Sequence, residues 1–275
     1  MGCIREWLRA MVIVWVMAGV VGAGEPVHAT TLTVGAAYSL RSALDEILPM
    51  FEKEYGATVQ VVYGPSHTLR RQIEHGAPID VFLPAAVREV EELAHKRLTL
   101  KGGVRIYAQT SLVLVMSATS EAIPLSFRDV LPNRATRIVL GDPKTSALGE
   151  LTARALTRLD PAYKAHFNLL RAQDSQDIMD WVRRGQADEG IIYRVDAINS
   201  RHLRIIDETP GGTYSPVYFA GAVVWTCRKT SLVVAEDFLD FMMSPRIQKL
   251  LLKDGFESPP SQERRIPFHR IAHEH

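Results

Sequence analysis

The fold is decided by residues 64–82, which read GPSHTLRRQIEHGAPIDVF. The stretch just before them, 58–63, is β-branched and alternates, as a strand with one buried face does. After the corner at Ser66, the apolar residues Leu69 and Ile73 are four apart, which is a helical spacing. The chain is therefore predicted to pass from a strand through Ser66 into a helix, and then into another strand.

The corner at Ser66 is suited to hold an anion. Unpaired backbone N–H groups converge at a helix N-terminus, where the helix dipole is positive. The hydroxyls of Ser66 and Thr68 lie there, so a bound anion needs no Lys or Arg partner. For one serine on its own, a helix cap is the simpler interpretation. A functional site requires the pattern to recur.

Composition and charge favour a soluble protein with a small ligand. The 275-residue chain is 47% hydrophobic and 23% charged, which is ordinary for a globular protein and long enough for two lobes. Lys and Arg number 32 against 31 Asp and Glu. This balance argues against a nucleic-acid partner or an acidic membrane surface, because proteins bind both through a positively charged surface.

Residues 1–29 are predicted to be a secretory signal peptide. Two arginines precede the uncharged run 11–21, MVIVWVMAGVV, and 27–29 offer a small-residue cleavage site. A transmembrane anchor is the alternative, but the run is short for a span of about 20 residues. Cys3 precedes the run, so it cannot be the lipid-bearing cysteine of a lipoprotein signal. We expect a periplasmic, unanchored protein.

Two further features have simple interpretations. After cleavage only Cys227 remains, so no internal disulfide can form, and its strand-like surroundings predict a buried, inert thiol. The tail, 259–275, holds three histidines that could take up a metal adventitiously. A solvated, disordered end is the expectation for it.

The rest of the chain alternates strands and helices, which predicts an α/β fold with a mainly parallel sheet. A strand at 31–34 leads through Ser39 to a helix with one apolar face, which Gly56 ends. Further strands are predicted at 79–83, 104–107, 111–116, 137–140, 190–193 and 218–225, and further helices at 86–96, around 151–156, and at 176–184, 232–242 and 245–253.

Hydroxyls or small residues recur where helices begin. They occur at Ser39, at Ser66, in the turn 146–149 and at Ser175, and a strand-end tyrosine, Tyr193, joins them. Ligands of open α/β sheets bind at the carboxyl ends of the strands. These corners can therefore face one cleft between two lobes.

Four collinear runs carry a resemblance to a known family. They are Ala36–Leu40, Ser66–Asp80, Gly141–Pro143 with Gly149, and Gly190–Ala197. With them the sequence resembles the periplasmic molybdate-binding proteins of ABC importers, over about 31–256. The resemblance implies a two-lobed type II periplasmic binding protein with crossover strands. Lobe 1 would comprise 30–111 and 219–258, and lobe 2 would comprise 112–218.

The resemblance also implies a site and a role. Ser39 and Ser66 would donate hydroxyl and backbone N–H groups, Leu148 and Ser175 backbone N–H groups, and Tyr193 its phenol. Molybdenum would be held as molybdate through these residues, with no direct metal ligand, no cofactor and no catalysis, and tungstate would bind too. The partner would be the ABC permease in the inner membrane, and we expect a monomer.

Two residues depart from the family pattern. Tyr38 stands where the family usually has a small residue, and it could add a donor, narrow the cleft or pack outward. His67 replaces a small polar residue, and it is interpreted either as an exposed first-turn histidine or as a pH-sensitive gate.

Three alternatives remain open. The site could hold sulfate, thiosulfate or an organic ligand, because cavity radius cannot be derived from sequence. An exported hydrolase could use Ser39 or Ser66 with His67, although no Gly-x-Ser-x-Gly elbow is present. A zinc site could use His67 and His75, but no further ligand is evident nearby.

Overall fold

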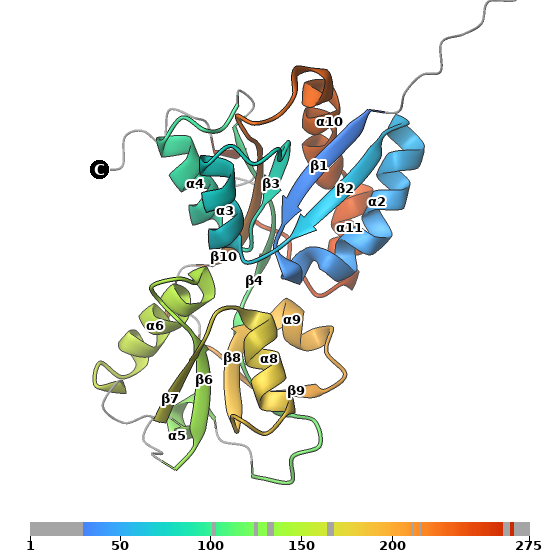
Figure 1. Cartoon of the computed structure of the whole chain (residues 1–275). Coiled ribbons are helices and arrows are strands. Elements are labelled where there is room, and N and C mark those ends of the chain that lie inside the picture. The colour runs from blue at the N-terminus through green and yellow to red at the C-terminus, as the bar shows by residue number, and fades with distance from the viewer. Residues whose placement is uncertain are drawn as a thin grey trace, which may run out of the picture.

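The computed structural model describes residues 30–100, 103–123, 126–130, 135–163, 168–210, 212–214, 216–260 and 265–266. They form two α/β lobes, each built on one mixed sheet (Figure 1). This architecture confirms the predicted fold class. The predicted signal peptide lies outside the described residues, and no helix within them is long and apolar enough to cross a membrane.

The first lobe is built on a sheet of strand order β11-β4-β10-β3-β1-β2. The strands β1, β2 and β3 are parallel, and β10 runs antiparallel to both β3 and β4. Helices α3 and α4 lie on one side, with α2, α10 and α11 on the other (Figure 1). The elements are β1 (Thr31–Ala36), η1 (Tyr38–Leu40), α2 (Arg41–Tyr55), β2 (Thr58–Tyr63), α3 (Ser66–Glu74), β3 (Val81–Leu83), α4 (Val87–His95), β4 (Val104–Thr110), β10 (Val217–Val223), η2 (Lys229–Ser231), α10 (Leu232–Met242), α11 (Pro245–Lys253) and β11 (Arg265–Ile266).

The second lobe is built on a sheet of strand order β7-β6-β8-β5-β9. The strands β7, β6 and β8 are parallel, whereas β5 is antiparallel to β8 and β9. The antiparallel strands make the sheets mixed, where a mainly parallel sheet was predicted. The elements are β5 (Leu112–Ser117), α5 (Phe127–Val130), β6 (Arg137–Gly141), α6 (Ala147–Leu159), β7 (Asn168–Ala172), α8 (Ser175–Arg183), β8 (Glu189–Tyr193), α9 (Arg194–Ile198) and β9 (Leu203–Glu208).

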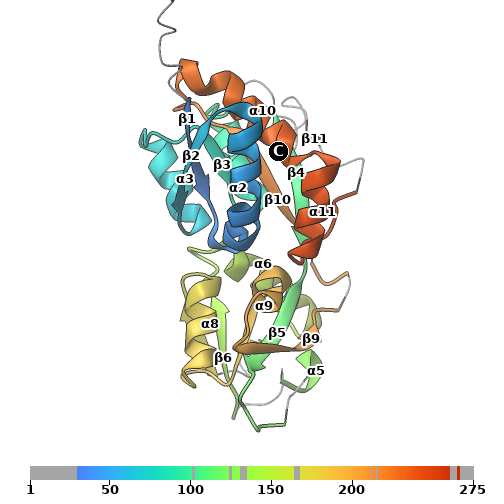
Figure 2. The ribbon, with the colours of Figure 1, turned by 90° about the vertical axis from the view of Figure 1, so that its right-hand side faces the viewer.

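The strands of the described segments place two crossings between the lobes, which Figure 2 shows from the side. The first crossing is at Ser111, between β4 and β5, and the second lies between β9 and β10. The predicted boundaries were 111/112 and 218/219. In the tail predicted to be disordered, β11 instead pairs with β4. That pairing satisfies backbone groups along a strand that would otherwise be a sheet edge.

The carboxyl ends of the parallel strands point toward the gap between the lobes (Figure 1). In the first lobe, β1 leads into η1, and β2 leads through two residues into α3. In the second, β6 and β7 lead into α6 and α8, and β8 continues directly into α9. Helix N-termini from both lobes are therefore brought to the same interface.

A buried carboxylate fixes the base of the first lobe. Asp80 is 1% exposed and accepts hydrogen bonds from the backbone N–H of Thr33 at 2.8 Å and of Arg228 at 3.1 Å. The Arg228 guanidinium also pairs with it at 2.8 Å. Burial alone would raise the pKa of Asp80, but the bonds from Arg228 and Thr33 outweigh it and lower the pKa. The carboxylate thus ties β1 and the segment after β10 to the start of β3.

We expect Asp80→Asn to lower the free energy of unfolding by about 2–4 kcal/mol, because it weakens several bonds to one buried charge. A lowered pKa stabilises the fold above the unfolded pKa of about 3.9, and this stabilisation is lost as the pH falls through the folded value. The difference from wild type should therefore shrink in acid. Urea unfolding at neutral and acid pH measures it.

The matched control is Asp188→Asn, in the half-exposed pair that Asp188 forms with Arg137 at 2.6 Å. Exposed pairs contribute little, so a loss under about 1 kcal/mol is expected. Equal losses in the two variants would contradict the role assigned to Asp80.

Candidate functional site

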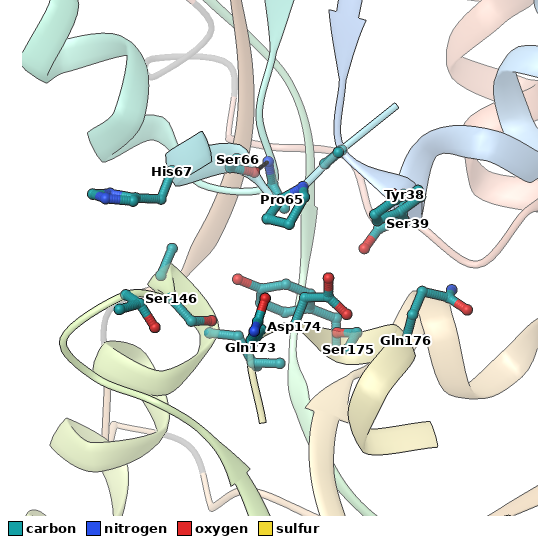
Figure 3. Close-up of a pocket in the computed structure, with 17 residues that line it drawn as sticks. Tyr38, Ser39, Pro65, Ser66, His67, Ser146, Gln173, Asp174, Ser175 and Gln176 are labelled. Carbon is teal, nitrogen blue, oxygen red and sulfur yellow. Dashed lines mark hydrogen bonds between the residues drawn. The ribbon is translucent and has the colours of Figure 1, made fainter. Parts of the chain in front are cut away.

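A small cavity lies between the lobes where the helix N-termini meet. It encloses about 50 Å³, and all five residues predicted to bind line it: Ser39, Ser66, Leu148, Ser175 and Tyr193. Figure 3 shows Ser39 and Ser66 on the side of the first lobe, facing Ser146, Asp174 and Ser175 on the second. One water needs about 10–15 Å³ measured in this way, so the cavity fits a small polyatomic species.

Ser66 is the first residue of α3 and does not cap it. Its Oγ accepts a hydrogen bond from the backbone N–H of Ala85 at 3.0 Å, and the residue at the cap position is Pro65. The simpler interpretation, in which Ser66 is only a helix cap, is therefore wrong. Because its oxygen is held as an acceptor by the loop after β3, its single proton can be donated to a ligand.

Ser39 lies in the short helix η1, between β1 and α2. Its hydroxyl donates to Oδ2 of Asp196 at 3.0 Å. Asp196 belongs to α9 in the second lobe, so this hydrogen bond joins the two lobes beside the cavity. Sequence reasoning did not identify Asp196 as a site residue. The available signal was its place three residues after Tyr193, within a run that had already been singled out.

The second lobe presents two capped helices to the cavity. Ser146 caps α6 by accepting the N–H of Gly149 at 3.3 Å, and Asp174 caps α8 by accepting the N–H of Asp177 at 3.0 Å. Leu148 and Ser175, 2% and 7% exposed, lie in the first turns of these helices. First-turn N–H groups have no partner within their own helix. Both backbones can therefore serve as donors, as the resemblance implied.

The first turn of α6 is held by a close backbone contact. A Cβ on Gly149 would lie 2.5 Å from the carbonyl carbon and oxygen of Gly141, and as close to the carbonyl carbon of Asp142. Only glycine lets the helix approach the end of β6 so closely. The pairing of Gly141 with Gly149 in the sequence pattern thus has a steric cause.

Tyr193 ends β8, and its ring packs edge-on against Phe219 at 6.0 Å between centroids. The side chain is 3% exposed, and among the described residues its hydroxyl has no hydrogen-bond partner. Burial raises the pKa of this phenol well above its usual value, so it stays protonated. A buried, unpaired O–H that lines a cavity is poised to donate to a ligand.

The residues that line the cavity carry no permanent positive charge. None of its lining residues is Lys or Arg, and only His67 could carry a positive charge. The Nδ1 atom of His67 lies 3.2 Å from the guanidinium of Arg70, and Figure 3 shows its ring directed away from Ser39. Burial raises the pKa of the Asp174 carboxyl. A ligand anion would therefore be held by dipoles alone.

Tyr38 lines the cavity and packs sideways within the first lobe. Its ring stacks on Tyr63 with centroids 6.5 Å apart, and the Arg41 guanidinium lies 4.5 Å from the Tyr63 centroid and 5.7 Å from that of Tyr38. Of the three roles considered for Tyr38, this placement favours narrowing of the cleft. The aromatic stack holds the ring in place.

A second contact joins the lobes on the other side of the cavity. Arg88 of α4 forms an ion pair with Glu150 of α6. His67, Glu89 and Lys144 share the adjoining polar groove. The described residues contain no cluster of three or more His, Cys, Asp or Glu side chains placed to hold a metal ion. The zinc alternative therefore gains no support within them.

The fold and a donor-lined cavity between two lobes define a solute-binding protein. The model of the bacterial extracellular solute-binding protein family matches residues 32–257, and the chain belongs to this family. It is 29% identical over 227 residues to YvgL of Bacillus subtilis, named as an ABC transporter substrate-binding lipoprotein, covering 82% of this chain and 86% of that one.

Two further similarities concern molybdate-binding proteins. The chain is 27% identical over 231 residues to the molybdate-binding protein ModA of Haemophilus influenzae, covering 82% of this chain and 90% of that one. It also shares the fold of the periplasmic molybdate-binding protein of Azotobacter vinelandii, with a TM-score of 0.71 and 23% identity. That match covers 83% of this chain and 99% of the other.

We expect Gly149→Ala to lower the free energy of unfolding by about 1–3 kcal/mol or more, because the added methyl group meets rigid backbone. Gly35→Ala is the control, since its Cβ would approach only the Ile79 side chain, at 3.1 Å, and that side chain can move. Urea unfolding compares the two. A Gly149→Ala protein as stable as wild type would contradict the close contact.

Proposed function

We propose that this protein captures molybdate, and tungstate with it, through neutral hydrogen-bond donors and delivers it to the permease of an ABC importer. The observation that carries the proposal is that donors from both lobes line one small cavity without any Lys or Arg. The similarity to molybdate-binding proteins supports it. The protein would act as a periplasmic monomer with no catalytic step.

The donor set fits a fully deprotonated oxyanion. Such an ion only accepts hydrogen bonds, and each charge-assisted bond contributes about 1.5–3 kcal/mol. The hydroxyls of Ser39, Ser66 and Tyr193 and the first turns of α6 and α8 supply donors from several directions. Partners of this kind, spread around the ion, suit a tetrahedral arrangement of acceptor oxygens.

The cavity size argues against an organic ligand. Pockets for drug-sized molecules are usually about 300–1,000 Å³, whereas this cavity encloses about 50 Å³. Sulfate carries the same charge and accepts the same bonds, so the donors alone do not separate it from molybdate. Molybdate is the larger of the two ions, so its fit in the cavity must separate it from sulfate. The binding of both ions therefore has to be compared directly.

The hydrolase alternative finds no support in the site. A serine nucleophile needs a base within hydrogen-bond reach. Ser66 Oγ is bonded to the backbone of Ala85, and the His67 ring lies beside Arg70. The hydroxyl of Ser39 donates to a carboxylate rather than to a histidine. We therefore assign no reaction to these residues.

Titration calorimetry on the mature protein tests the ligand. We expect 1:1 binding of molybdate and tungstate with dissociation constants at micromolar level or tighter, and much weaker binding of sulfate and phosphate. Sulfate that binds as tightly as molybdate would assign the site to a different oxyanion. The absence of heat with all four ions would overturn the proposal.

The Tyr193→Phe variant should change oxyanion affinity without lowering the free energy of unfolding. Because its hydroxyl has no partner among the described residues, removing it should leave the free energy of unfolding unchanged or slightly higher. Oxyanion binding should weaken by about 1–3 kcal/mol, since one donor to the ion is lost. Urea unfolding and calorimetry on the same preparation measure both. Unchanged affinity would remove Tyr193 from the site.

A further inference from the structure

The carboxylate of Asp196 lies immediately behind the predicted donors. The carboxylate accepts a hydrogen bond from the Ser39 hydroxyl at 3.0 Å. The hydroxyl of Ser175 is also close enough to lower the pKa of Asp196. Within the described residues, however, the Ser175 hydroxyl makes no hydrogen bond of good geometry. Asp196 is 7% exposed and follows Tyr193 by three residues. A buried acid therefore lies beside three of the five residues predicted to hold the oxyanion.

The Ser39 hydroxyl cannot serve Asp196 and a bound oxyanion at the same time. A serine hydroxyl has one proton to donate. While Ser39 donates that proton to Asp196, it cannot donate it to an oxyanion. For Ser39 to act as a donor to the ligand, either its hydroxyl must rotate away from Asp196, or Asp196 must cease to be an acceptor.

The two routes differ in whether the buried Asp196 carboxyl keeps its hydrogen-bond partner. Rotation of the hydroxyl would leave a buried carboxylate with one donor fewer, close to a second carboxylate, Asp174, and to a doubly negative ligand. Leaving a buried charge without its partner is costly. If Asp196 instead takes up a proton, its O–H can donate to Ser39 Oγ, and the Ser39 proton then turns to the oxyanion. Every group keeps a partner.

We propose that binding of the oxyanion is coupled to uptake of one proton from solvent by Asp196, which orients the Ser39 hydroxyl toward the ligand. Asp196 is thus a positioning residue that acts through Ser39, and it touches neither the ion nor its metal atom. The inference rests on the proposed function.

Among the residues that the structure describes, no cation is paired with Asp196. The N-terminus of α9 is fixed to the lobe crossing, because the N–H of Arg194 donates to the carbonyl of Ser111 and that of Val195 to Thr110 Oγ1. The Arg194 side chain pairs with Glu208 of β9. Besides Asp196 itself, the charged or titratable groups of the adjoining groove lie on η1, α2, α8 with its cap, and the segment after α9. They are Tyr38, Arg41, Asp45, Asp174, Asp177, Asp180, Arg183, Arg201 and His202.

The titration behaviour of Asp196 is consistent with this geometry. Burial raises its pKa to about 6, Asp174 adds to the rise, and the hydroxyls of Ser175 and Ser39 oppose it. A bound dianion would raise the pKa further. Below about pH 6 the acid is already protonated, so affinity is insensitive to pH, and above it affinity falls as the pH rises.

Calorimetry with molybdate measures this coupling on the unmodified protein. Titrations near pH 7 in two buffers of different ionisation enthalpy should show uptake of about one proton per ion bound. Between about pH 6 and pH 8 the association constant should fall by up to about tenfold per pH unit. No proton uptake together with a flat pH profile would overturn the inference.

Asp196→Asn identifies the group, because its amide can donate to Ser39 Oγ at every pH. This variant should bind molybdate about tenfold or more tightly than wild type near pH 8, without proton uptake. Asp174→Asn and His67→Gln change the carboxyl and the imidazole that line the cavity and should retain the uptake. Uptake that persists in Asp196→Asn and disappears in either of those variants would assign the proton elsewhere and overturn the inference.

The outcomes separate this inference from the proposed function. Tight molybdate binding with the same affinity at every pH would leave the function standing and overturn the coupling. No binding of molybdate at any pH would overturn both.

Discussion

On the proposed function, the site depends on one constraint, the burial of a double negative charge with no Lys or Arg among the residues that line the cavity. An anion taken out of water needs a hydrogen-bond donor for each of its acceptor sites. Each acceptor site without a donor carries a desolvation cost. Helix N-termini supply several N–H groups in one direction, and hydroxyls supply the rest. The beginnings of η1, α3, α6 and α8 at the interface between the lobes fit this requirement. The arrangement of strands and crossings delivers those helix ends to one cavity.

Because the donors are divided between the lobes, ligand binding and lobe approach are coupled. Ser39 and Ser66 belong to the first lobe, and Leu148, Ser175 and Tyr193 belong to the second. A ligand that bonds to both sides favours the closed arrangement by its differential contacts. The two lobe-to-lobe contacts on either side of the cavity, Ser39 with Asp196 and Arg88 with Glu150, favour the same arrangement. On the proposed function, release of the ligand to a permease would break them, and we expect the crossings at Ser111 and after Glu208 to act as the hinges.

The local sequence predicted the strand-to-helix junctions well. At each junction the spacing of the apolar residues changes from two to 3.6 near a serine, where the strand ends and the helix begins. The local sequence also led to Ser39, Ser66 and Tyr193, all of which line the cavity. Long-range partners could not be predicted in this way. The acceptor role of Ser66 depends on Ala85, and Asp196 meets Ser39 across 157 residues. The antiparallel strands β5 and β10 made both sheets mixed, since a βα pattern says nothing about strands that cross between lobes.

On the proposed function, hydrogen-bond acceptors near the cavity influence which oxyanions bind. Hydrogen phosphate carries an O–H that needs an acceptor, and the two nearby carboxylates are the candidates. Asp174 is engaged by the backbone N–H groups of Asp177 and Gln176, as the cap of α8. Asp196 is engaged by Ser39, and once protonated it becomes a donor toward that serine. In either protonation state Asp196 has its partner within the protein. Asp174 lines the cavity and Asp196 does not, so Asp174 is the carboxylate that a protonated ligand could reach. Its bonds within the cap of α8 leave it fewer free acceptor sites for the O–H of such a ligand, which on the proposed function favours ions that carry no proton.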